Sequence, residues 1–235
     1  MNRPVSGDEL PDIDARTLDV PDVIPIFPLP KVVLLPGEVL PLHIFEARYR
    51  EMVRDAVATH KVMGIVEVLP GFEDQLPGSP PVRDVGCIGY IASHEELEDG
   101  RFLLWLLGLE RFKILEELSA ETAYRQVRVH YEPTPESPKR LAEIRALREE
   151  LRELLPSLVQ LEDTARGQFA RHMTDVSDSQ LIALACQILE ISSARKQEVL
   201  EAASLTDRFL MLYEDLYRHL DLNPGAEHLD PDQLN

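Results

Sequence analysis

Two short stretches of the sequence carry histidine and carboxylate side chains at spacings that metal sites use. His43 and Glu46 lie three residues apart in "PLHIFEARYR", and His94 and Glu95 begin a pattern that resembles the zinc-protease motif HExxH. That motif needs a second histidine four residues after the first, because two imidazoles on one helix face bind the zinc ion. Position 98 is Glu98 instead. The HxxE spacing is common by chance, so neither stretch predicts a metal site.

The sequence also lacks the glycine-rich and nucleophile motifs of common enzymes. It has no GxxxxGK[ST] loop for phosphate, no GxGxxG after a predicted strand and no GxSxG around a serine. Cys87 and Cys186 form no CxxC pair and lie in apolar runs, which predicts buried thiols. We predict no catalytic residue, no cofactor and no metal ligand. A hydrolase with an unrecognised site stays open, because the members of a Ser–His–Asp or Ser–Lys site can occur in any order along a chain.

The segment from His43 to Tyr49 has two interpretations. In the first it is structural: His43 ends a strand and bonds to backbone, and Glu46 lies in the first turn of a helix, where a carboxylate suits the helix dipole. Glu46 and Arg48 are two residues apart on that helix and should not face each other. We therefore expect Glu46 to pair with Arg111 or Arg125, and its removal to lower the melting temperature more than that of His43.

In the second interpretation the same segment lines a groove for a ligand. The candidate groove residues are His43, Phe45, Glu46, Arg48, Tyr49 and Arg111. The structural interpretation is favoured, since a strand–helix junction with an ion pair explains these residue types without a ligand.

Composition and charge restrict the classes of partner. The formal net charge is −18, and acidic residues outnumber basic ones in both halves of the chain. Nucleic acid and anionic membranes would be repelled over most of such a surface, so we expect neither as a partner. No apolar run reaches the roughly 18 residues of a membrane span, and the N-terminus resembles neither a signal nor a transit peptide. A cytoplasmic location is therefore expected.

From residue 23 to about 132 the sequence predicts short β-strands. Gly, Pro and acidic turns separate apolar or alternating runs, and this density of strands is typical of a closed or half-closed barrel. Pro36-Gly37 predicts a type II turn and Asp99-Gly100 a hairpin turn, because glycine tolerates the positive φ that both need. The expected strands cover residues 23–27, 32–35, 61–69, 87–97, 101–109, 111–118 and 124–132.

One helix should interrupt the strands. In "FEARYREMVRDAVA" the apolar residues recur at helical spacing. They are Phe45, Tyr49, Met52, Val53 and Ala56.

After "PTPESP" (133–138) the pattern changes to helical periodicity and predicts a bundle of about five helices. Ser137 is a good N-cap and Pro138 suits the first helical position. Ser177 and Gln180 form a capping box that opens a helix apolar nearly all round, which should be central. The first helix carries an apolar stripe of Leu141, Ile144, Leu147, Leu151 and Leu154.

The predicted fold class is therefore α+β, a β-rich barrel with one inserted helix followed by a helical bundle. We expect a flexible acidic tail at residues 1–22, the β-rich domain at 23–132, the bundle at 133–222 and a second tail at 223–235.

The stretch "IPIFPLPKVVLLPGEVLPLHIFEARYREMV" resembles the opening of the Lon N-terminal (substrate-binding) domain family, in the form found in small stand-alone proteins. "VGCIGYI" and "GLERFKI" are similar to two later sequence motifs of that family, and the resemblance extends over roughly residues 23–220. It implies a pseudo-barrel related to PUA-like folds, followed by helices.

In full Lon proteases this region helps to recognise substrate polypeptide, and the ATPase and the Ser–Lys peptidase lie further along the chain. The resemblance implies a non-catalytic module that binds polypeptide or a protein partner, since 235 residues hold no phosphate loop and no room for that ATPase. PUA-like barrels often bind RNA, so RNA binding is a further alternative, which the negative charge disfavours.

Overall fold

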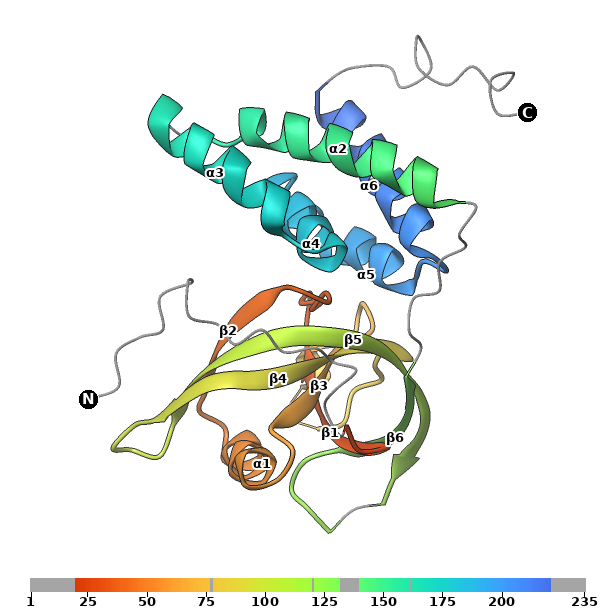
Figure 1. Cartoon of the computed structure of the whole chain (residues 1–235). Coiled ribbons are helices and arrows are strands. Elements are labelled where there is room, and N and C mark those ends of the chain that lie inside the picture. The colour runs from red at the N-terminus through yellow and green to blue at the C-terminus, as the bar shows by residue number, and fades with distance from the viewer. Residues whose placement is uncertain (1–19, 77, 120, 132–139, 161, 221–235) are drawn as a thin grey trace. The chain divides into compact units, whose positions relative to one another are not determined.

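The computed structural model describes residues 20–76, 78–119, 121–131, 140–160 and 162–220. Its contacts divide the chain into two units, Met1–Pro133 and Thr134–Asn235. Strands dominate the first unit and helices the second (Figure 1), so the architecture is α+β, as the sequence predicts. The expected hinge at 133–138 and most of the two expected tails lie outside the described residues.

Pairing closes five of the described strands into a ring. β5 is the longest strand and pairs with β4 over its first part and with β6 over its last part, while β1 joins β6 to β3. β1 and β3 are parallel and the other pairs are antiparallel. The strands are β1 (Val23–Leu29), β2 (Val39–Ile44), β3 (Val62–Glu67), β4 (Val85–Glu96), β5 (Phe102–Leu118) and β6 (Gln126–Tyr131).

β2 stands apart from this ring. Of the described strands it pairs with β5 alone, along the first part of that strand, in an antiparallel register from Val39↔Leu107 to Ile44↔Phe102. Figure 1 shows it beside the long β4–β5 hairpin. The hairpin turns where the sequence predicts it, with Gly100 at φ 77°.

Two strand predictions are wrong. Residues 32–35 form no strand, although Val33, Leu34 and Leu35 are buried. Apolar runs indicate burial without saying whether the backbone pairs, and here the segment crosses β5 at Gly108, where a Cβ would lie 2.1 Å from the Leu35 carbonyl oxygen. Residues 101–109 and 111–118 form one strand, because that glycine admits the crossing backbone without ending the strand.

The turn after this crossing segment is as predicted. Gly37 has φ 81°, and the Glu38 N–H donates to the Leu35 carbonyl at 3.0 Å, which closes a four-residue turn with Pro36 and Gly37 at its centre.

The inserted helix α1 (Ala47–Ala58) packs against β1 and β3. Its buried residues are Tyr49, Met52, Val53 and Ala56, four of the five that the spacing predicts. The fifth, Phe45, precedes the helix and is 62% exposed. The Tyr124 hydroxyl donates to Asp55 at 2.8 Å and ties the outer face of α1 to the chain before β6.

The second unit holds five described helices, in line with the sequence. α4 packs against α2 and α6, α2 also contacts α3, and α5 contacts α6. Ser177 and Gln180 form the predicted capping box, with bonds of 2.8 and 3.3 Å. The helices are α2 (Leu141–Leu158), α3 (Asp163–Asp175), α4 (Asp178–Ile188), α5 (Ser193–Glu201) and α6 (Leu205–His219).

Details of the first bundle helix differ from the prediction. α2 buries Leu155 completely, whereas Leu154 is only half-buried, because the stripe turns by one residue after Leu151. The predicted cap residues Ser137 and Pro138 lie outside the described residues.

Both cysteines are buried, as predicted. None of the described helices combines the length and the apolarity needed to cross a bilayer.

Candidate functional site

Glu46 occupies the N-cap position of α1 rather than its first turn. Its backbone is extended (φ −67°, ψ 136°) and its side chain makes no capping bond. Because Glu46 is not helical, the rule that separates residues two apart on a helix does not apply to it. Its carboxylate pairs with the Arg48 guanidinium, with N···O distances of 2.9 and 3.1 Å. The predicted pairing with Arg111 or Arg125 is therefore wrong.

Arg48 also holds the loop that follows β3. Its guanidinium donates to the carbonyl of Leu76 at 2.6 Å and to that of Gly78 at 3.0 Å. Arg125 donates to the carbonyl of Pro80 at 2.8 Å and pairs with Glu117 through two bonds of 2.7 Å. Two arginines thus bind three carbonyl oxygens of one Pro- and Gly-rich loop, residues 76–80.

Tyr49 lies behind this pair. Its ring is buried, stands 4.4 Å from the ring of Phe27 and has the Arg48 guanidinium 4.5 Å above it. Burial raises the pKa of the Tyr49 hydroxyl, and the neighbouring Arg48 opposes that shift in part. The phenol is therefore neutral at physiological pH and packs as part of the core.

Arg111 is a buried residue of the barrel. It belongs to β5, opposite Cys87 of β4, and is only 7% exposed. The structure thus brings Glu46, Arg48 and Tyr49 together, and Glu46 pairs with Arg48 instead of Arg111.

His43 and Phe45 form the exposed part of the segment. His43 is the penultimate residue of β2, as predicted, and its side chain is exposed rather than bonded to backbone. Its ring centroid lies 6.1 Å from that of Phe45. Phe45 is the most exposed large apolar side chain described. An aromatic surface beside a strand end can accept apolar side chains from a partner.

The second unit has an open depression of about 300 Å³ between the ends of α4, α5 and α6. Leu189 and Ile191 supply apolar lining, and Arg195, Asp215 and His219 supply polar groups. Sequence reasoning did not find it, because its lining comes from three helices whose packing no local pattern predicts.

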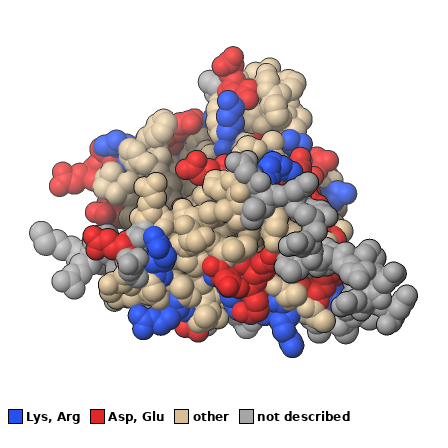
Figure 2. All heavy atoms as spheres, turned by 90° about the horizontal axis from the view of Figure 1, so that it is seen from above, with Lys and Arg blue, Asp and Glu red and all other residues tan. Residues whose placement is uncertain are grey.

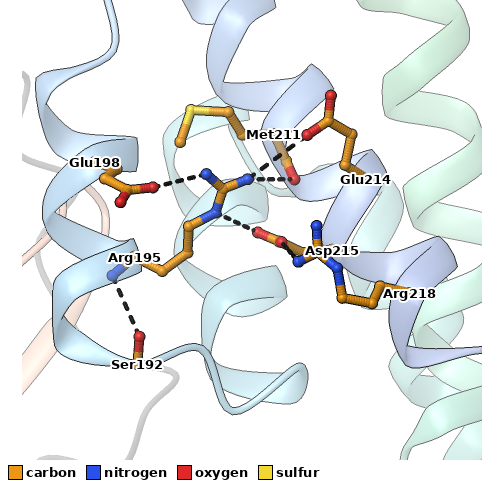
Figure 3. Close-up of polar contacts among 7 residues, drawn as sticks. All are labelled: Ser192, Arg195, Glu198, Met211, Glu214, Asp215 and Arg218. Atoms are coloured by element: carbon orange, nitrogen blue, oxygen red, sulfur yellow. Dashed lines mark hydrogen bonds and ion pairs between the residues drawn. The ribbon is translucent and has the colours of Figure 1, made fainter.

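The charged groups of this depression bind one another (Figure 3). Arg195 donates to Asp215 at 2.9 Å and to Glu198 at 2.7 Å, and Arg218 donates to the other Asp215 oxygen at 2.7 Å. Asp215 is 9% exposed and has an arginine on each oxygen. The network ties α5 to α6, and we assign it a structural role.

The described residues give no sign of a nucleic-acid or metal site. On the face drawn in Figure 2, basic side chains are interspersed with acidic ones, and the described residues there form no continuous basic patch. Within the described ranges, no three His, Cys, Asp or Glu side chains lie close enough together to hold a metal ion.

The sequence matches the model of the substrate-binding domain of ATP-dependent protease La (Lon) over residues 23–218. The chain belongs to this family. Two Lon relatives, Lon protease from Anaeromyxobacter dehalogenans and Lon protease 2 from Myxococcus xanthus, are each 27% identical over 213 residues. Each match covers 90% of this chain and 25% of the relative. The chain therefore spans about a quarter of the length of these Lon proteases.

Solved Lon N-terminal domains share the fold. The N-terminal domain of the Mycobacterium avium complex Lon protease is 21% identical, with a TM-score of 0.66 over 84% of this chain and 99% of that one. A Lon N-terminal domain protein from Xanthomonas campestris is 22% identical, with a TM-score of 0.57 over 82% of this chain and 97% of that one.

Proposed function

We propose that this Lon-family chain is a polypeptide-binding module that carries no ATPase or peptidase activity of its own. The observation that carries the proposal is the match of the Lon substrate-binding domain over residues 23–218. The sequence supports it, since it contains neither a phosphate-binding loop nor a recognisable peptidase motif.

We place the contact surface at His43 and Phe45. Phe45 is 62% exposed, next to an edge strand, and the rest of its segment is held in place by the Arg48 contacts with the loop 76–80. An apolar group on a fixed backbone binds at a lower entropic cost than one on a loose loop. The unfolded segments of client proteins expose apolar side chains that such a group can bury.

The test compares two exposed apolar residues of the same unit. Phe45→Ala should weaken binding of fluorescently labelled, reduced and alkylated lysozyme by about 5- to 30-fold, which is the loss of about 1–2 kcal/mol at one contact residue. Leu115→Ala is the matched control, because Leu115 is 60% exposed but lies on β5. Equal effects of the two changes would contradict this placement of the surface.

Activity assays on the same preparation address the alternatives. We expect no ATP turnover and no cleavage of casein above background. ATP turnover that a point mutation in this chain abolishes would overturn the proposal. A salt-dependent mobility shift with RNA, in the absence of polypeptide binding, would favour the RNA-binding alternative.

A further inference from the structure

Among the strands that the structure describes, none pairs with the edge of β2 that faces away from β5. The strand order is β2-β5-β4-β3-β1-β6, and the additional β5–β6 pairing closes the ring without involving β2. β2 therefore has a row of backbone groups on one side that the sheet does not use.

The register identifies these groups. Gly108 N–H donates to the Glu38 carbonyl at 2.8 Å, so this pair is hydrogen-bonded. Bonded and non-bonded pairs alternate along an antiparallel ladder. Val39, Pro41 and His43, which lie opposite Leu107, Trp105 and Leu103, are therefore non-bonded positions whose backbone groups point outward.

Pro41 supports this assignment independently. Proline has no N–H to donate, and Pro41 lies at a position where the pairing with β5 requires no N–H. The outward edge then offers two donors, the N–H groups of Val39 and His43, and three acceptors, the carbonyls of Val39, Pro41 and His43. Among the residues that the structure describes, no hydrogen bond engages any of these five groups.

A second open edge in the same unit is protected, and the contrast is informative. Within the described part of the chain, the end of β4 beyond Ile91 pairs only with β5, and it carries His94, Glu95 and Glu96. Arg54 of α1 donates to Glu96 at 2.7 Å, which adds a second charged group beside that edge. Charged side chains are a usual means of preventing edge strands from pairing with other chains.

β2 has no such protection. Residues 39–45, VLPLHIF, contain no charged side chain, and Pro41, His43 and Phe45 are exposed. Only the missing N–H of Pro41 limits the pairing capacity of this edge. That leaves a strand that can bind another backbone weakly and reversibly.

We propose that an extended segment of a client polypeptide adds to the open edge of β2 as a further strand. This inference rests on the proposed function and specifies how the client is held. Main-chain hydrogen bonds give affinity that does not depend on the client's sequence. Phe45, at the end of the edge, adds a contact for an apolar side chain.

Charge selects the occupant of this edge. A second copy of the chain also carries a net charge of −18, so the overall charge of the two copies opposes their association. A client segment that contains Lys or Arg would be attracted to the acidic chain. The preferred occupant is an extended, basic segment with apolar residues at alternate positions.

The experiment changes the outward donors without touching the bonds to β5. His43→Pro removes one outward N–H, and His43→Ala is its control, because it removes the same imidazole and keeps the N–H. Pro41→Ala adds one outward N–H. The probe is a labelled 12-residue peptide of alternating Val and Thr with terminal lysines, and its affinity is measured by fluorescence anisotropy.

We expect His43→Pro to bind about 2- to 12-fold more weakly than His43→Ala, and Pro41→Ala to bind more tightly than wild type by a similar factor. A version of the peptide with its central amides N-methylated should lose binding to every variant. Circular dichroism shows whether His43→Pro is folded, and Pro41→Ala with the methylated peptide keeps the test complete if it is not.

The outcomes separate the two proposals. If wild type binds neither this peptide nor unfolded lysozyme, the proposed function fails. If wild type binds the peptide, but N-methylation and both proline changes leave affinity unchanged, the edge pairing is overturned and the function stands. If Pro41→Ala instead produces dimers in sedimentation velocity without tighter peptide binding, the edge pairs with a second copy and the proposed occupant is wrong.

Discussion

Arg48→Ala should destabilise the β unit more than the same change at Glu46 or His43. The Arg48 side chain is 20% exposed, and its loss removes two bonds from a charged donor to the carbonyls of Leu76 and Gly78. Bonds of this kind contribute about 1.5 kcal/mol or more each. The pair with Glu46, which is 42% exposed, adds about 0–1 kcal/mol.

The contact of the guanidinium with the ring of Tyr49 adds about 0.5–1 kcal/mol. Water replaces part of what is lost, so we expect a net decrease of about 2–4 kcal/mol in the free energy of unfolding. Glu46→Ala should cost under about 1 kcal/mol, because its partner keeps both carbonyls. The sequence singled out Glu46 as a member of an ion pair, whereas in the structure the larger cost falls on its partner Arg48.

Urea unfolding followed by tryptophan fluorescence measures this cost in the correct unit. Trp105 is the single tryptophan of the chain and lies in β5, so its signal reports on the β unit alone. Arg54→Ala is the matched control, since Arg54 lies on the same helix and its pair with Glu96 is about half exposed on both sides. Hydrogen exchange of residues 69–76 should accelerate in Arg48→Ala only.

One result would refute this reasoning. If Arg48→Ala and Arg54→Ala unfold at the same urea concentration and exchange equally slowly in the loop, the contacts of Arg48 with the loop do not stabilise it. The segment would then have to be explained by binding alone.

Two further predictions concern close packing and buried charge. Gly108→Ala should destabilise the β unit by about 3 kcal/mol, since a Cβ would meet a backbone carbonyl oxygen at 2.1 Å. Gly167 lies in open space on α3, so Gly167→Ala should stabilise the chain by about 0.5–1 kcal/mol. Denaturant titrations check both. Arg195→Ala should lower the free energy of unfolding by about 2–3 kcal/mol, because it leaves the buried Asp215 with one partner. Arg218 is 72% exposed, so Arg218→Ala should lower it by under about 1 kcal/mol. Thermal unfolding followed by circular dichroism compares the two variants.

Local patterns predicted local features well. The Pro36-Gly37 turn and the Ser177 capping box depend on a few neighbouring residues, and the structure contains both. The periodicity that predicted α1 placed its buried face correctly from Tyr49 onward. The error at its start was a single position, since Glu46 is the N-cap and not part of the first turn. That shift lets Glu46 pair with Arg48, which the helical spacing had excluded.

Features that depend on distant parts of the chain were not predictable in this way. Nothing near Arg48 in the sequence indicates that its partners are carbonyls some 30 residues later, because a carbonyl oxygen is present at every position. The burial of Leu34 and Leu35 looked like a strand because an apolar run is the same whether it pairs or only packs. Gly108 was the one local sign of the crossing, since a glycine inside a strand often marks a close approach of another backbone.

The structural role and the proposed binding role of the His43–Tyr49 segment can be separated by experiment. Arg48 and Tyr49 point into the unit and fix the loop and the helix start, whereas His43 and Phe45 are exposed at the end of an open edge. If clients bind at His43 and Phe45 as proposed, the rigid inner half holds the outer half in place before binding, and little order has to form when a client arrives. Phe45→Ala should therefore change affinity without changing the urea midpoint. Arg48→Ala should change both, because a loosened junction no longer holds the edge in place.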